Sequence, residues 1–191
     1  METVRIGIIG CGGMGKSHAA ALQKITGVAV AAAAETRAEV LGAFQAEFKV
    51  SRGYACFHEM LKAGGLEAVV VCLPTHLHRD AVVAAAAAHV QVFCEKPLAR
   101  TVAEGAAMLA ACADRGVMLQ VGFVRRFDNG WNTARRIVQE GTLGTPAVWR
   151  DFRASYGPGH NPWYFDRAQG GGPFLDGMIH NFDFANHMFG R

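Results

Sequence analysis

The sequence has no cysteine pair of the C-x-x-C type, no basic leader segment, no block of like charges and no apolar run long enough to cross a bilayer. Of its five cysteines, Cys11, Cys72 and Cys94 lie in or beside apolar runs, so we expect buried thiols in a reducing compartment rather than a disulfide framework. The longest apolar stretch, residues 80–92, is too short for a transmembrane helix. These absences predict a cytoplasmic protein without a signal peptide.

Charge of one sign is also scarce, because 19 basic and 16 acidic residues leave a net charge of +3. We therefore expect neither a nucleic acid nor an anionic membrane as a partner. The hydrophobic fraction of 51% and the charged fraction of 18% are typical of a globular chain. The length of 191 residues permits one large domain, or one domain and part of another.

Short apolar runs alternate with helical patterns through the first part of the chain. The runs predict strands, and the patterns between them predict helices. The strands are expected at 4–9, 28–34, 67–73, 90–94 and 117–121, and the helices at 13–25, 37–48, 77–88 and 102–115. Continuous Val and Ile runs separated by helices are typical of strands covered on both faces. We therefore predict an α/β fold with a doubly wound parallel sheet.

The pattern changes near residue 122, where we place a domain boundary. Beyond it we predict a helix at 129–140, a strand at 147–156 with partial polar alternation, a loop at 157–172 and a helix at 173–189. A lone strand cannot satisfy its backbone groups or bury its apolar face. We therefore expect the second domain to be incomplete and the chain to be truncated.

A glycine-rich motif of the form G-x-G-x-x-G follows the first predicted strand and opens the first helix. It consists of Gly10, Cys11, Gly12, Gly13, Met14 and Gly15. Gly10 permits the tight turn, Gly12 lets the backbone approach a pyrophosphate, and Gly15 lets helix and strand pack closely. The helix N-terminus supplies free N–H donors and partial positive charge. The alternative is an ordinary glycine turn, but the flanking strand and helix favour a Rossmann dinucleotide site.

The end of the second predicted strand bears on the choice of dinucleotide. A carboxylate at Glu35 can accept both hydroxyls of an adenine ribose and would repel a 2′-phosphate, which favours NAD. Arg37 can instead pair with that phosphate, which keeps NADP open. Glu35 can also be explained as an acidic residue that the helix dipole stabilises at a helix N-terminus. We predict NAD, with Glu35, Thr36 and Arg37 at the adenosine end, and NADP as the alternative.

Two further places in the sequence carry candidate chemistry. Lys96 follows a predicted strand, where a lysine reaches the ligand crevice of a parallel sheet and can donate to a substrate hydroxyl; a surface lysine in a turn explains it equally well. Asp176 and His180 are four residues apart on the last predicted helix, so they share a face. His is the natural general base near neutral pH, and the carboxylate can orient it.

Asp176 and His180 also have simpler explanations, as an exposed i,i+4 pair or a satisfied core histidine. Asp183 lies one further turn along and is able to join their face. No third residue stands at ligand spacing, so we predict no metal site. His76 and His78 are interpreted as loop groups near the cofactor.

These motifs, in this order, resemble the glucose–fructose oxidoreductase / inositol dehydrogenase / MocA (Gfo/Idh/MocA) family along the whole chain. The matching runs are GCGGMG at 10–15, PTHLH at 74–78, EKP at 95–97, GFVRRF at 122–127 and GGGPFLDGMIH at 170–180. The RRFD stretch is similar to myo-inositol dehydrogenases in particular. Glu35 departs from the family pattern, in which Asp is commoner. The chain corresponds to about the first half to two-thirds of a typical member.

The resemblance implies a Rossmann domain at 1–122, followed at 123–191 by the first part of an α+β catalytic domain with a mainly antiparallel sheet. It implies hydride transfer from a secondary alcohol of a cyclic polyol or sugar to NAD(P). Lys96, Asp176 and His180 would form the catalytic group, in which His180 takes the hydroxyl proton, Lys96 hydrogen-bonds the reacting oxygen and Asp176 holds the base or a neighbouring hydroxyl.

The same resemblance places further residues around the ligands. Those expected near the cofactor, in addition to Lys96, are Leu73, Pro74, Thr75, His78, Glu95 and Gln120. Arg125 and Trp163 are candidates on the substrate side, and the Lys96–Pro97 bond is expected to be cis. The full-length protein is expected to be a homo-oligomer, and a further reading is that the 191-residue form is inactive as it stands. The alternative function is a non-catalytic NAD(P)-binding regulatory or sensor protein of the same fold.

Overall fold

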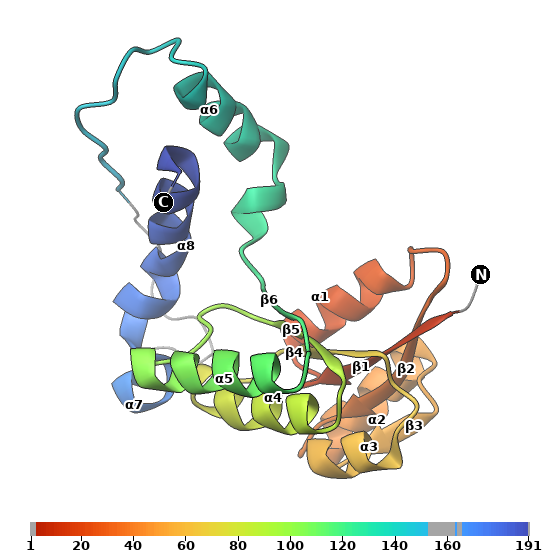
Figure 1. Ribbon diagram of the computed structural model, residues 1–191. Helices are drawn as coiled ribbons and strands as arrows, with labels where there is room; N and C mark the ends of the chain where they lie inside the picture. Colours follow the sequence, from red (N-terminus) through yellow and green to blue (C-terminus); the bar gives the residue numbers. More distant parts are fainter. Residues whose placement is uncertain (1–2, 153–162, 164–165, 191) are drawn as a thin grey trace. The chain divides into compact units, whose positions relative to one another are not determined.

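The computed structural model describes residues 3–152, 163 and 166–190 (Figure 1). The chain divides into two compact units, Met1–Val121 and Gly122–Arg191. None of the helices among the described residues combines the length and the apolar character needed to span a bilayer. All five cysteines are free thiols, and Cys11 and Cys94 are buried.

The first unit is built on a six-stranded sheet. Its strands are β1 (Val4–Ile9), β2 (Val28–Ala34), β3 (Arg52–Tyr54), β4 (Ala68–Val71), β5 (Gln91–Cys94) and β6 (Leu119–Val121). They are ordered β3-β2-β1-β4-β5-β6, and every neighbouring pair is parallel. The predicted doubly wound parallel sheet is therefore confirmed. The direction of winding reverses between β1 and β4, and in such sheets ligands bind in the crevice at the carboxyl ends of the strands there.

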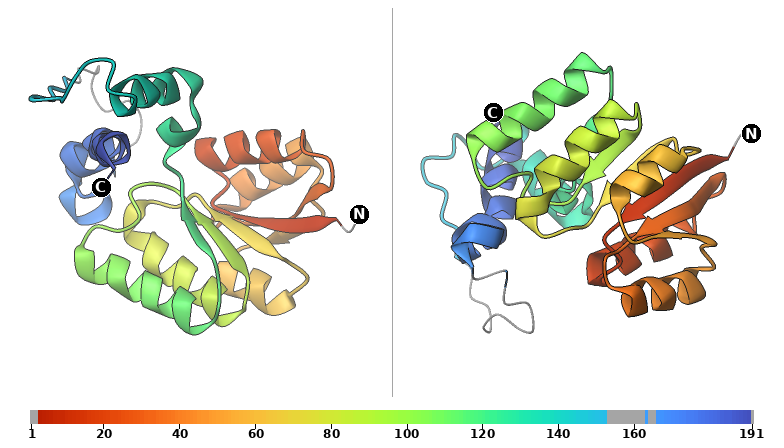
Figure 2. Two further views of the ribbon diagram at one scale, coloured as in Figure 1. Left: turned by 45° about the horizontal axis from the view of Figure 1, so that its top comes forward. Right: turned by 90° about the horizontal axis from the view of Figure 1, so that it is seen from below.

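Helices cover both faces of this sheet. They are α1 (Gly13–Leu22), α2 (Ala38–Phe48), α3 (Phe57–Ala63), α4 (His78–Ala87) and α5 (Val102–Asp114), with the short helix η1 (Thr75–Leu77) before α4. Figure 2 shows α1 and α2 on one face and α3, α4 and α5 on the other. Phe44 packs with the β1 residue Ile8 in the first core layer, and Met60 and Met108 pack with Val69 in the second. This burial on both faces explains why the strands read as continuous apolar runs.

The regular secondary structure of the second unit is helical over its described residues. They are η2 (Val124–Phe127), α6 (Asn129–Gln139), α7 (Arg167–Gly170) and α8 (Gly172–Phe189). Helix α6 packs on α8, where Trp131 meets the fully buried Phe184 edge to face at 4.7 Å between ring centroids. Side chains of α6 also satisfy the last carbonyls of α8, because Arg135 Nε donates to His187 O at 3.1 Å and Gln139 Nε2 donates to Met188 O at 3.2 Å.

The strand predicted at 147–156 is wrong over its described part. Residues 147–152 have no regular secondary structure and are exposed, and residues 153–156 lie outside the described residues. The polar alternation of the sequence suits a strand, but no strand among the described residues of this unit offers it backbone partners. The contact of the Trp149 ring with Phe189, at 6.0 Å between centroids, attaches the segment to the end of α8 instead.

Candidate cofactor and catalytic site

The glycine turn between β1 and α1 is packed so tightly that two of its glycines cannot be replaced without movement. Gly10 has φ +93°, and a Cβ built there would lie 2.5 Å from the carbonyl oxygen of Cys72. A Cβ on Gly15 would lie 2.1 Å from the carbonyl oxygen of Gly10. Both glycines therefore let backbone meet backbone, as the sequence motif predicts for the turn and for helix–strand packing.

The other two glycines of the motif have no such internal reason. A Cβ on Gly12 or Gly13 would meet no atom within 4 Å. Gly12 is the N-cap of α1 and makes no side-chain capping bond, while the half-exposed Met14 follows in the first turn. The N–H groups that begin α1 are thus left for an anion, and the absent side chains leave room for it to approach. This part of the turn fits the pyrophosphate of a dinucleotide.

Glu35 lies at the carboxyl end of β2, beside the glycine turn. Its side chain is 9% exposed, and its carboxylate accepts from Cys11 N at 3.2 Å, from Arg37 N at 3.2 Å and from Arg37 Nε at 3.0 Å. Burial raises the pKa of the Glu35 carboxyl, but the bonds and charge of Arg37 outweigh it and hold the pKa below its usual value. Exposed Thr36 adds a weak bond to Glu35 at 3.4 Å. An ionised carboxylate therefore stands where an adenine ribose is expected.

Glu95 links the carboxyl end of β5 with α1. Its Oε1 lies 2.7 Å from His18 Nε2, and its Oε2 accepts from Lys96 N at 3.1 Å. Burial raises the pKa of Glu95, yet the bond and charge of His18 and the bond from the Lys96 amide lower it overall. His18 is a residue of this site that the sequence motifs do not predict. Its signal is helical spacing, because Gly15 and His18 are three residues apart on α1 and Gly15 faces the sheet.

Lys96 follows Glu95 directly and is half-buried, and its bond to Pro97 is cis, as the family resemblance implies. Leu73 and Pro74 are half-buried at the carboxyl end of the neighbouring strand β4, and Thr75 is buried. Gln120 is exposed in β6, paired in register with Phe93 of β5.

His78 begins α4 and is 1% exposed. Its Nε2 lies 2.8 Å from Leu73 O, and its Nδ1 lies 2.9 Å from Pro97 O. Burial lowers the pKa of His78, although the carbonyl contacts and the charge of Glu95 act in the opposite direction. Both ring nitrogens therefore face backbone carbonyls and not the crevice.

A comparison with known protein families matches both parts of the chain. Residues 4–123 match an oxidoreductase family with an NAD-binding Rossmann fold, and residues 131–191 match the Gfo/Idh/MocA C-terminal domain. The chain belongs to the Gfo/Idh/MocA family. This confirms the predicted family, the Rossmann fold class and, at the level of the family, NAD as the cofactor.

Relatives within the Gfo/Idh/MocA family include named inositol dehydrogenases. The chain is 36% identical over 188 residues to myo-inositol 2-dehydrogenase of Thermotoga maritima, covering 98% of this chain and 55% of that protein. It is 32% identical over 191 residues to the NAD(+)-dependent scyllo-inositol 2-dehydrogenase of Bacillus subtilis, covering 98% and 54%. The chain therefore spans about half the length of these relatives.

Solved structures of the family share this fold. A probable dehydrogenase from Thermotoga maritima superposes with a TM-score of 0.85 at 35% identity, covering 98% of this chain and 55% of that one. Scyllo-inositol dehydrogenase from Lactobacillus casei, solved with NAD(H) and scyllo-inositol, has a TM-score of 0.71 at 29% identity and covers 75% and 43%.

The residues that the family resemblance predicts for catalysis do not all belong to the same unit. Lys96 belongs to the first, whereas Asp176 and His180 lie one turn apart on α8 of the second. Asp176 is 5% exposed and His180 is half-buried. That they share one cavity with Lys96 stays a prediction. Over the residues that the structure describes, no group of three or more His, Cys, Asp or Glu is arranged to hold a metal.

Asp183, the third polar residue of this stretch of α8, has a structural partner. Its side chain is 6% exposed, and it accepts from Arg126 Nη2 at 2.5 Å and from Arg126 Nε at 3.0 Å. The pair fastens η2 to α8. Next to it, the Arg125 guanidinium lies over the Trp131 ring, 4.4 Å from its centroid. Trp163, the other residue predicted near the substrate, is half-buried.

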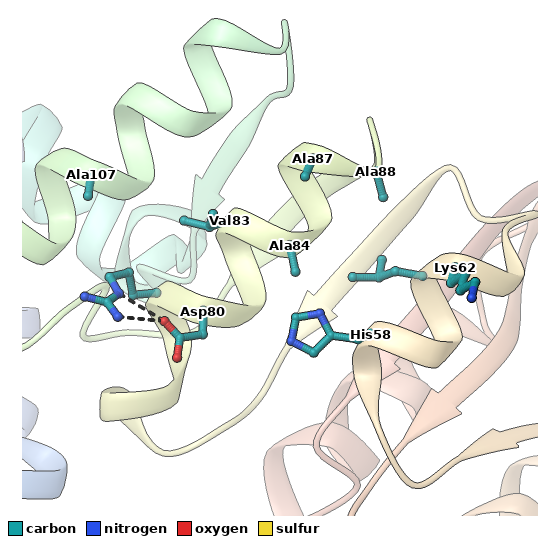
Figure 3. Close-up of a pocket in the computed structure, with 10 residues that line it drawn as sticks. His58, Lys62, Asp80, Val83, Ala84, Ala87, Ala88 and Ala107 are labelled. Atoms are coloured by element: carbon teal, nitrogen blue, oxygen red, sulfur yellow. Dashed lines mark hydrogen bonds and ion pairs between the residues drawn. The ribbon is translucent and has the colours of Figure 1, made fainter.

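A groove of about 860 Å³ lies elsewhere on the first unit, between α3, α4 and α5 (Figure 3). Methyl groups of α4, such as those of Val83 and Ala84, form much of its wall, and the Arg79–Asp80 ion pair lies at its rim at 2.9 Å. None of the residues predicted for cofactor or substrate lines this groove. It is therefore not part of the candidate site.

Proposed function

We propose that this chain supplies the cofactor domain, residues 1–122, and the first part of the substrate domain, residues 123–191, of an NAD-dependent dehydrogenase. The enzyme oxidises a secondary alcohol of a cyclic polyol or sugar. The observation that carries the proposal is the open N-terminus of α1 at Gly12 and Gly13, beside an ionised Glu35. The inositol dehydrogenases among its relatives support the class of substrate.

Residues 10–15 would hold the pyrophosphate and Glu35 the hydroxyls of the adenine ribose. The pairing of Arg37 with Glu35 supports NAD over NADP, because a 2′-phosphate would meet a carboxylate and a guanidinium that is already engaged. The cofactor residues predicted on the other strands would flank the nicotinamide half. They are Leu73, Pro74, Thr75, Glu95, Lys96 and Gln120, whereas the ring of His78 is turned to backbone carbonyls. When bound, NAD supplies the ring that accepts the hydride.

The chain's own residues would move and hold the proton. His180 takes the proton of the substrate hydroxyl, and Asp176, one turn earlier on the same face of α8, holds the base or a neighbouring hydroxyl. The Lys96 ammonium donates to the reacting oxygen. Arg125 and Trp163 are proposed to contact the substrate.

The proposal is tested by binding and turnover measured separately. Calorimetric titration of this chain with NAD and NADP is expected to show tighter binding of NAD, and NAD is expected to raise the melting temperature. The complete enzyme is then assayed with inositols and pyranoses by NADH absorbance. The proposal fails if millimolar NAD leaves the melting temperature unchanged. Tight NAD binding without turnover of any polyol would instead favour the regulatory alternative.

A further inference from the structure

His78 connects two loops that leave neighbouring strands of the sheet. Leu73 follows β4, and its carbonyl oxygen lies 2.8 Å from His78 Nε2. Pro97 and Leu98 follow β5, and their carbonyl oxygens lie 2.9 and 3.3 Å from His78 Nδ1. The ring is 1% exposed, so water does not compete for these contacts. One buried side chain thus spans the carboxyl ends of β4 and β5.

Both nitrogens of the His78 ring are taken up by these contacts, so neither can bind a ligand. A backbone carbonyl only accepts, so each contact is a hydrogen bond only when the facing ring nitrogen carries a hydrogen. A neutral imidazole donates once and an imidazolium twice. Burial lowers the pKa of His78, whereas the carbonyl contacts and the charge of Glu95 raise it, and only the imidazolium bonds both loops at once. In either form, both nitrogens are directed at the backbone.

We propose that His78 is a positioning residue that fixes the separation of the two loops, and not itself a group that binds the cofactor. One loop begins at Leu73, in the segment assigned to the cofactor, and the other carries Lys96. The functional meaning of this separation rests on the proposed function, because that is what assigns NAD to the first loop and the reacting oxygen to the second. The separation itself is testable without a ligand.

Asn and Gln each replace one of the two ring nitrogens, so they test the two contacts separately. The amide nitrogen of Asn stands close to the place of His Nδ1, whereas that of Gln reaches the place of Nε2. His78→Asn therefore keeps a donor for Pro97 O and loses the one for Leu73 O. His78→Gln keeps the donor for Leu73 O and loses the one for Pro97 O. His89→Asn is the matched control, since His89 is exposed just beyond α4 with φ +56°, a conformation that Asn tolerates.

The experiment follows backbone amide signals of this chain by NMR in each variant. We expect His78→Asn to move the signals of Cys72 and Leu73 and to spare those of Lys96 and Leu98, and His78→Gln to do the reverse. His89→Asn is expected to leave all four unchanged. If both His78 variants move the two loops alike, or move neither, the positioning role is overturned.

A second measurement relates the loops to the cofactor. His78→Asn is expected to raise the Kd for NAD about fivefold to tenfold, the effect of one lost buried hydrogen bond, and His78→Gln to change it less than threefold. Opposite ranking of the two variants would contradict the assignment of the Leu73 loop to NAD. If wild type binds no NAD but each His78 variant moves only the amide signals expected for it, the proposed function fails and the positioning role stands.

Discussion

Arg37 makes its hydrogen bonds to Glu35 through both its backbone nitrogen and its guanidinium, at 3.2 and 3.0 Å. Taken separately in the sequence, Glu35 favours NAD and Arg37 admits NADP. Paired, they present one compact group in which the Glu35 side chain is 9% exposed and the Arg37 side chain is 60% exposed. We therefore expect cofactor choice to depend on the pair.

Replacing Glu35 by Gln is expected to shift cofactor preference toward NADP. The substitution removes the negative charge that repels a 2′-phosphate and releases Arg37 to bind it. We expect the ratio of the Kd values for NADP and NAD to fall about tenfold, which corresponds to about 1.4 kcal/mol. Calorimetric titration of both cofactors measures the ratio. Glu59→Gln, at an exposed acid of α3, is the control, and an unchanged ratio in Glu35→Gln would refute the role of the pair.

The two kinds of glycine in the turn predict opposite effects of the same substitution. Gly12→Ala places a methyl group in open space at φ −72°, so we expect only the small loss of stability that Ala causes at an N-cap, while NAD binding weakens about tenfold or more. Gly15→Ala directs its methyl at the Gly10 carbonyl, 2.1 Å away, and is expected to lower stability by about 1–3 kcal/mol. Thermal unfolding and NAD titration of both variants check this. Equal loss of stability in both would contradict the distinction.

How far the sequence predicts the fold depends on how each segment buries its side chains. Long apolar runs such as Val28–Ala34 are covered on both faces, and this pattern predicts the parallel sheet. The edge strand Arg52–Tyr54 is too short and too polar to produce such a pattern, and Phe57–Ala63 spans only seven residues, so neither was predicted. The strand predicted at 147–156 fails because alternation describes a side-chain pattern and supplies no partner for the backbone.

The site is predictable where a backbone position is constrained, and less so where side chains from distant segments meet. The glycine motif is local, and the structure gives Gly10 and Gly15 the packing that the motif requires. The contact between His18 and Glu95 joins residues 77 positions apart, and the helical spacing of His18 from Gly15 does not identify Glu95 as its partner. His78 was assigned to the cofactor surroundings from its motif, but the sequence does not indicate that its ring is turned toward backbone carbonyls.

Glu95 predicts a pH dependence of stability in the acid range. Its folded pKa is lowered from 4.5 by its bonds to His18 and the Lys96 amide, despite burial, which raises it. The carboxylate therefore contributes stability that is fully present above 4.5 and is lost as the pH falls through the lower folded value. Glu95→Gln is expected to be less stable than wild type at pH 7, with the difference shrinking as the pH falls from 4.5. Urea unfolding across this range measures it, and a constant difference would refute the linkage.

Substitution of Lys96 and His180 tests whether the two units contribute to one reaction centre. Lys96 would stand only at the nicotinamide end, and neither residue belongs to the glycine turn or the Glu35–Arg37 pair that would hold the rest of NAD, so Lys96→Ala and His180→Ala are expected to leave the Kd for NAD nearly unchanged. Each should lower kcat with an inositol by about 10²-fold or more in the complete enzyme, the usual contribution of a general acid or base. Because the two groups would act on the same hydroxyl, the double variant should lose less than the product of the single losses. Losses that multiply would mean that the lysine and the imidazole act independently, and the shared reaction centre would have to be abandoned.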